Sequence, residues 1–305
     1  MASFSPADAA IEGFRTVRQH PQVILVWGVI LAVQAFVGTL VLVNMAGSAL
    51  QKMTTMTAAS AATVDPTEVF QFYGQILPAY LFVMLLSLAS YSVLIPAALR
   101  MVIRPQDKGL AFLRIGPAEL RQVAVNLIVS LILFGVYMGV AIFAVVLGVI
   151  MAPLGGTALG RVAVIGLVLV VAIAVMLFFM VKFSLAGAQT FAEGRVRIFG
   201  SWSLTGGRFW RVLGAYALAG VLALIVIFLG AVIAVVAAMA VGGGTGALSA
   251  FFKPDFSSYR TYMTPAVTIY QVVMAFIMTL VLPIMICPSA RIYQAVAGTR
   301  QTEVF

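Results

Sequence analysis

Six long runs of apolar residues alternate with shorter polar segments along the chain. Each run is long enough to cross the hydrocarbon core of a bilayer, which is about 30 Å thick and needs about 20 residues of helix. The runs cover residues 23–45, 76–98, 123–150, 162–186, 212–241 and 267–287. The sequence sustains no strand-like alternation, and a helix satisfies its own backbone hydrogen bonds in lipid. The pattern therefore predicts an all-α polytopic membrane protein with six transmembrane helices.

The composition leads to the same class of protein. Of the 305 residues, 63% are hydrophobic and only 9% are charged, whereas a soluble domain carries roughly a quarter of charged residues. So few charges cannot cover a water-soluble body of this length, which excludes a soluble enzyme and a disordered protein. The chain has a single cysteine, Cys287, so it can form neither an internal disulfide nor a cysteine metal cluster.

The basic residues are distributed unequally between the two sides of the predicted bilayer. Of the 18 Lys and Arg residues, 14 fall on the side that carries both ends of the chain. Cytoplasmic loops are enriched in Lys and Arg, so this side is expected to be cytoplasmic, with both termini inside. The positive excess also attracts anionic lipid headgroups. No soluble basic module is present, so nucleic acid is not an expected partner.

The segments before the first, third and fifth runs resemble one another. Residues 10–18, 111–121 and 197–211 each mix Arg with bulky apolar residues over two to three helical turns. Such a helix lies flat in the headgroup layer with its apolar face toward the lipid tails. We therefore predict one integral membrane domain over residues 1–305. It would consist of three tandem units, each an interfacial amphipathic helix followed by a transmembrane hairpin, with approximate bounds 5–105, 106–190 and 191–295.

The stretch from Ser201 to Arg211 reads Ser-Trp-Ser-Leu-Thr-Gly-Gly-Arg-Phe-Trp-Arg. It resembles a phrase of the YciC-like group of bacterial inner-membrane proteins, which is related to the membrane domain fused to some glycerophosphodiester phosphodiesterases. Residues 4–6 and 113–116 fit the same group. Members usually have a basic residue where this chain has Gly206. The resemblance implies a helical fold in the bacterial inner membrane and assigns no activity.

Groups that could carry out catalysis are sparse. The only histidine, His20, lies at a predicted membrane boundary before Pro21, and the nine acidic residues are scattered outside the apolar runs. Patterns for zinc hydrolases and for a serine nucleophile are absent, and Cys287 fits a packing role. We therefore expect no enzymatic activity, no metal and no cofactor.

Two groups of residues are candidates for a functional site. Arg and Trp side chains in the segments before the spans are expected to contact lipid headgroups: Arg114, Arg121, Trp202, Arg208, Trp210 and Arg211. Polar side chains within the spans would line a cavity, or make interhelical hydrogen bonds worth about 1 kcal/mol: Gln34, Asn126, Lys182 and Gln271.

Two further patterns bear on the packing of the spans. Lys182 lies near the end of the fourth run, where it would extend its ammonium to the interface or, facing the bundle, bind an anionic headgroup. The spacing of Gly135 and Gly139 in the third run predicts close helix packing, within the chain or between two copies of it.

The leading hypothesis is a non-enzymatic inner-membrane protein with a structural or accessory role. It would act in lipid organisation or bind a membrane-protein partner, with anionic lipids as its expected ligands. The alternative is a transporter or flippase of a lipid or small amphiphile, which requires a polar-lined cavity between the hairpins. An intramembrane enzyme is a third hypothesis and would require acidic residues and His20 around one pocket.

Overall fold

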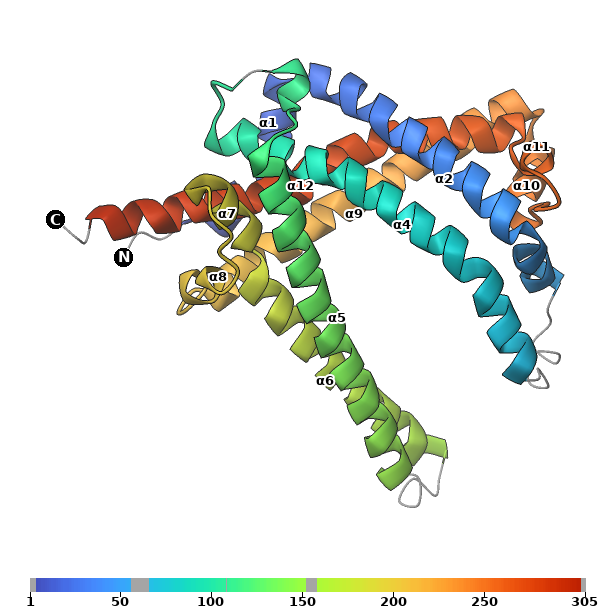
Figure 1. The fold of residues 1–305 in the computed structure, drawn as a ribbon, viewed down its shortest axis with the longest axis horizontal. Coiled ribbons are helices and arrows are strands. Elements are labelled where there is room, and N and C mark those ends of the chain that lie inside the picture. Colours follow the sequence, from blue (N-terminus) through green and yellow to red (C-terminus); the bar gives the residue numbers. More distant parts are fainter. Residues whose placement is uncertain (1–3, 56–65, 108, 152–157, 303–305) are drawn as a thin grey trace. The chain divides into compact units, whose positions relative to one another are not determined.

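The computed structural model describes residues 4–55, 66–107, 109–151 and 158–302, and most of them are helical (Figure 1). Within these ranges, six helices are long and apolar enough to cross a membrane, and no strand occurs. They are α2 (Gln22–Thr55), α4 (Pro66–Ile103), α5 (Pro117–Met151), α6 (Ala158–Phe183), α9 (Phe209–Gly242) and α12 (Pro265–Thr302). The prediction of an all-α polytopic protein is confirmed, and the chain is a multi-pass membrane protein.

Short helical elements connect the long ones. They are α1 (Pro6–Gln19), η1 (Leu110–Phe112), α7 (Ala186–Glu193), α8 (Gly200–Leu204), η2 (Thr245–Leu248), α10 (Ser249–Phe252) and α11 (Tyr259–Tyr262). The first of them, α1, is amphipathic as expected. Ala9, Ala10 and Val17 are buried, whereas Arg18 in its last turn is exposed.

The segment before α5 differs from the helix that the sequence predicts over residues 111–121. Only the three-residue turn η1 forms, and regular helix starts at Pro117. Ala111 and Phe112 have φ angles of 50° and 62°, in the left-handed region that L-residues seldom occupy. Gly116 precedes a proline, and this position disfavours helical backbone.

Two side chains from the neighbouring helices hold this turn in place. The indole N–H of Trp27 donates a hydrogen bond to the Ala111 carbonyl at 3.1 Å. The buried guanidinium of Arg100 donates to the Phe112 carbonyl. These bonds satisfy carbonyls that a helix would otherwise use, which explains why the apolar–basic pattern does not become a helix here.

The segment before α9 also forms a shorter helix than the pattern over residues 197–211 suggests. The helix α8 is five residues long, and Gly207 turns the chain with a φ of 69° before α9 begins. The three segments that precede a hairpin thus differ in length and conformation. The threefold repeat and its unit bounds stay predictions.

The chain divides into two compact units. The α2–α4 unit comprises Ile11–Arg114 and Ala219–Ile286, and the α5–α6 unit comprises Ile115–Leu218 with Met1–Ala10 and Cys287–Phe305. The helices α9 and α12 contribute residues to both units. Each unit has its own buried apolar cluster.

In the α2–α4 unit, α2 and α4 lie side by side (Figure 1). Its core is built around Trp27, Leu94 and Phe112. Two glycines allow close helix contacts: a Cβ added to Gly28 would lie 2.5 Å from the ring of Phe276, and one added to Gly230 would lie 2.6 Å from the Ile277 side chain. Small residues therefore allow close contacts of α2 and α9 with α12.

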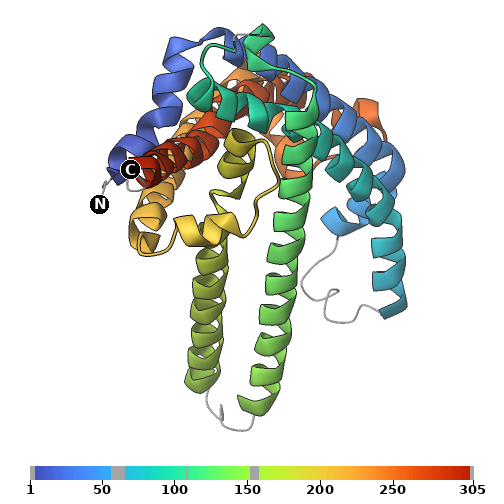
Figure 2. The same cartoon turned by 60° about the vertical axis from the view of Figure 1, so that its left-hand side comes forward.

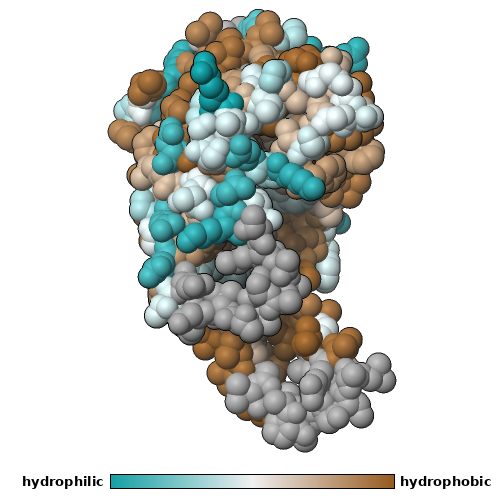
Figure 3. All heavy atoms as spheres, turned by 90° about the vertical axis from the view of Figure 1, so that its right-hand side faces the viewer, coloured by the Kyte–Doolittle hydropathy of each residue, from teal (hydrophilic) through white to brown (hydrophobic). Residues whose placement is uncertain are grey.

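In the α5–α6 unit, α5 and α6 form an antiparallel hairpin (Figure 2). Large apolar side chains such as Phe134, Ile142 and Leu167 are exposed along it, and brown, hydrophobic atoms lie above the grey atoms at the bottom of Figure 3. Lipid tails, not water, suit such a surface. The buried cluster of this unit gathers Leu185, Val212 and Ile292.

Candidate functional site

A buried serine joins the end of α6 to α8. The Ser201 hydroxyl accepts a hydrogen bond from the Leu185 N–H at 3.1 Å and donates one to the Lys182 carbonyl at 2.6 Å. Ser201 is 0% exposed, so water does not compete for these bonds. The pair of bonds fixes α8 against the last turn of α6 and thereby positions Trp202.

The ammonium of Lys182 lies against aromatic rings. Its Nζ is 5.2 Å from the ring centroid of Trp202 and 5.6 Å from that of Phe178. Both distances fall within the range of about 6 Å in which a cation is attracted to a ring face. The charge therefore sits beside a half-exposed indole at the end of a membrane span.

The two rings beside this lysine belong to a larger aromatic cluster. Phe178, Phe179 and Phe183, which are spaced along α6, each contact Trp202, with ring centroids 5.7, 5.9 and 5.8 Å apart. The other members of the aromatic cluster are Phe199, Phe209 and Trp210. Trp202 is 38% and Trp210 78% exposed. Exposed Trp side chains of this kind are typical of the membrane–water boundary.

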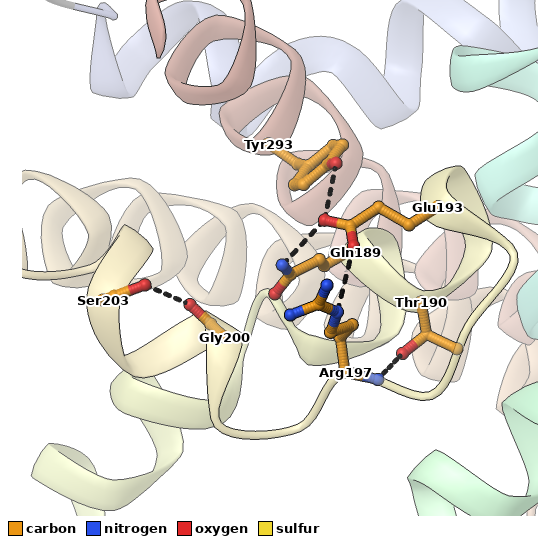
Figure 4. Close-up of polar contacts among 7 residues, drawn as sticks. All are labelled: Gln189, Thr190, Glu193, Arg197, Gly200, Ser203 and Tyr293. Carbon is orange, nitrogen blue, oxygen red and sulfur yellow. Dashed lines mark hydrogen bonds and ion pairs between the residues drawn. The ribbon is translucent and has the colours of Figure 1, made fainter.

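The connection between α7 and α8 is held by a single carboxylate (Figure 4). Glu193 accepts hydrogen bonds from Gln189 at 2.8 Å and from the Tyr293 hydroxyl at 3.4 Å, and it forms an ion pair with Arg197 at 3.4 Å. The backbone N–H of Arg197 also donates to the Thr190 hydroxyl at 3.0 Å. These contacts tie α7, α12 and the connecting segment together, which fits a structural role for Glu193.

The expected headgroup residues fall into both units. Trp202, Arg208, Trp210 and Arg211 lie on α8, on the following turn or at the start of α9, all within the α5–α6 unit. Arg121 lies in the same unit near the start of α5 and is partly exposed. Arg114 belongs to the α2–α4 unit, where it is exposed and forms an ion pair with Asp107 at 3.6 Å.

The polar residues within the spans occupy three separate places. Gln34 and Gln271 line one groove of the α2–α4 unit. Asn126 accepts a hydrogen bond from Gln122, one helical turn earlier on α5, at 3.2 Å. Lys182 belongs to the aromatic cluster. Of the four residues, the structure therefore brings only two to a shared cavity.

The groove has a volume of about 520 Å³ and is lined by α2, α4 and α12. The Gln34 amide donates to the Ser87 hydroxyl at 3.0 Å, and the Gln271 amide donates to the Thr39 hydroxyl at 3.0 Å. The carbonyl oxygens of both glutamines are buried and have no hydrogen-bond partner among the described residues. Two buried polar atoms thus remain unsatisfied by the part of the chain that the structure describes.

The sequence does not single out several residues of these two places. Thr39, Tyr80 and Tyr270 line the groove, and Phe179 and Phe183 contact the Trp202 ring beside Lys182. Phe179 and Phe183 are four residues apart, which places them on one face of α6. Periodicity does not say which helix packs against that face, so their grouping required the structure.

Metal-binding groups do not cluster in the part of the chain that the structure describes: no set of three or more His, Cys, Asp or Glu side chains could hold an ion there. His20 packs edge-on against the Phe112 ring, with centroids 4.9 Å apart. Cys287 is buried. The expected lack of enzymatic activity stays a prediction.

No known protein family, curated protein or solved structure matches the chain. The resemblance to the YciC-like group stays a prediction.

Proposed function

We propose that this chain is a non-enzymatic protein of the bacterial inner membrane that binds anionic lipid at its cytoplasmic face. The observation that carries the proposal is the position of the Lys182 ammonium, 5.2 Å from the ring of the half-exposed Trp202. A cation beside an amphipathic ring offers a lipid phosphate a charge partner and offers the glycerol region an apolar contact.

Two arginines add positive charge to the same stretch of chain. Arg208 and Arg211 flank Phe209 and Trp210 where α9 begins, and neither forms an ion pair with any residue in the described ranges. Uncompensated basic residues near an anionic membrane surface contribute about 1 kcal/mol each to lipid attraction. Together with Lys182, they favour an acidic phospholipid over a zwitterionic one.

A charge-matched pair of variants tests this proposal. Native mass spectrometry in mild detergent would compare the retention of phosphatidylglycerol and phosphatidylcholine. For R208Q/R211Q we expect phosphatidylglycerol binding about thirtyfold weaker, because two contributions of about 1 kcal/mol are lost. The control K253Q/R260Q removes two charges from the α10–α11 region and should bind like the wild type. Equal retention in the two variants would contradict the proposal.

A transporter or flippase of a small amphiphile is the second candidate, and the groove between α2, α4 and α12 favours it. Such a protein needs a polar-lined cavity at membrane depth, and Gln34 and Gln271 provide one. In proteoliposomes, the movement of a fluorescent lipid between leaflets would separate the two functions. A rate above that of protein-free vesicles supports transport, and an equal rate supports binding alone.

A further inference from the structure

The groove between α2, α4 and α12 contacts the stretch of α2 that the sequence predicts to cross the bilayer, residues 23–45. Gln34 is 12 residues and Thr39 17 residues from the start of α2, which at 1.5 Å per residue is about 18 and 25 Å along the helix. A hydrocarbon core is about 30 Å thick. Polar atoms at this depth must find partners in protein or ligand, because the lipid tails offer none.

Each glutamine amide in the groove has hydrogen-bonding capacity to spare. The amide nitrogens of Gln34 and Gln271 each donate to a hydroxyl, and both carbonyl oxygens are buried without a partner among the described residues. A hydroxyl both donates and accepts. If the oxygen and nitrogen of either amide changed places, the hydroxyl would donate to the oxygen, and the NH2 group would be left without a partner instead. Because both oxygens are shielded in this structure, a ligand hydroxyl reaches an amide only after the glutamine side chain turns toward the groove, and it then satisfies the amide in either orientation.

The rest of the lining suits an apolar chain. Leu31, Leu42 and Val83 together with Met274 and Met278 provide apolar side chains, and flexible methionines adapt well to varied apolar ligands. The volume of about 520 Å³ falls within the range typical of small-molecule sites. Tyr80 on α4 lines the groove and is 60% exposed, so a ligand can reach it from the surrounding lipid.

The lining also excludes a charged headgroup. Among the described residues that line the groove, none is Asp, Glu, Lys, Arg or His. A charge without a partner inside the bilayer is costly, so a phosphate would not enter here. The ligand must therefore be polar but uncharged at its head.

We propose that this groove binds an uncharged lipid whose headgroup carries hydroxyls, such as a monoacyl- or diacylglycerol. The headgroup hydroxyls hydrogen-bond to the amides of Gln34 and Gln271, and the acyl chain lies along the apolar side chains. The site is independent of the anionic-lipid site at Lys182, because the two places belong to different units and have opposite requirements for charge.

Photo-crosslinking of the wild-type protein in detergent tests the site directly. The probe is a monoacylglycerol with a diazirine in its acyl chain, and the competitors are monoolein and methyl oleate, which has the same chain without hydroxyls. We expect attachment to peptides that contain residues 80–91 or 270–278, with monoolein competing about tenfold better. Attachment only to other peptides, or equal competition by the two lipids, would overturn the proposal.

Variants identify the groups that bind the headgroup. Q34L/Q271L should lower crosslinking about tenfold, because both amides are lost while the size of the side chains is nearly kept. Q122L removes another buried glutamine with an unpartnered oxygen, on α5, and should leave crosslinking unchanged. A35L keeps both amides but fills the groove, and it should also abolish labelling, which keeps the test decisive if the double variant does not fold. Unchanged labelling in Q34L/Q271L or in A35L would count against the site.

Discussion

At the scale of the residue, one buried hydroxyl sets the geometry of the proposed anionic-lipid site. Ser201 bonds to the backbone on both sides of the end of α6 and so determines where Trp202 lies relative to Lys182. The sequence indicated both Trp202 and Lys182 as candidates. Ser201 appeared only as part of the phrase that resembles the YciC-like group, because a serine next to a tryptophan carries no pattern that reveals its backbone partners.

The variant S201A tests this positioning role. It leaves the Leu185 N–H buried without a partner, which costs about 1–3 kcal/mol, and it frees Trp202 from Lys182. We expect a lower unfolding temperature in detergent and weaker phosphatidylglycerol retention, although no charge changes.

The matched control is S203A. Ser203 is exposed and donates to the Gly200 carbonyl at 2.9 Å, and its loss should change stability by about 0.5 kcal/mol or less. If S201A is as stable as S203A and retains lipid equally well, Ser201 does not position the site.

At the scale of the element, glycine contacts decide how closely the helices approach. The predicted small-residue surface, Gly135 and Gly139, meets no atom within 4 Å of an added Cβ in the described part of the chain. Close contacts between long helices or with α1 occur instead at glycines such as Gly13, Gly28 and Gly230, whose spacing in the sequence shows no motif. Close packing at Gly135 and Gly139 within the described chain is therefore not observed, and packing between two copies of the chain stays a prediction.

The variant G13A tests the contact between α1 and α12. A Cβ at Gly13 would lie about 2.5 Å from backbone atoms of Pro283 and Ile284, and backbone cannot move aside as a flexible side chain can. We expect a destabilisation of about 1–3 kcal/mol, measured by thermal unfolding in detergent.

The control for this contact is G220A on α9, where nothing lies within 4 Å of the added Cβ among the described residues. Alanine is a better helix former than glycine by up to about 1 kcal/mol, so G220A should be neutral or stabilising. Equal stability of G13A and G220A would show that α1 does not pack closely against α12.

At the scale of the whole molecule, the six apolar runs predicted the six long helices and the class of protein. Bilayer thickness imposes a length that is visible in the sequence alone. Pairing between helices is not visible in this way: Gln271 meets Thr39 across 232 positions of sequence, and nothing local to either residue specifies the other. The groove could therefore be predicted by its residue types but not assembled from them.

The segments before the spans show a second limit at this scale. Their shared Arg–aromatic composition predicted three similar interfacial helices, and the first forms a 14-residue helix. The segment before α5 forms a turn instead, because Trp27 and Arg100 bind the carbonyls of Ala111 and Phe112. Distant side chains overrode the local pattern.

Lipid-specific quenching of tryptophan fluorescence tests the central claim, anionic-lipid binding beside Lys182, most directly. The chain has three tryptophans; Trp27 is 0% exposed, whereas Trp202 and Trp210 are accessible to lipid. The protein would be reconstituted in mixed vesicles in which only phosphatidylglycerol, or only phosphatidylcholine, is brominated. We predict stronger quenching by brominated phosphatidylglycerol, and loss of that difference in K182Q/R208Q/R211Q. Equal quenching of the wild-type protein by the two lipids would contradict the proposed function.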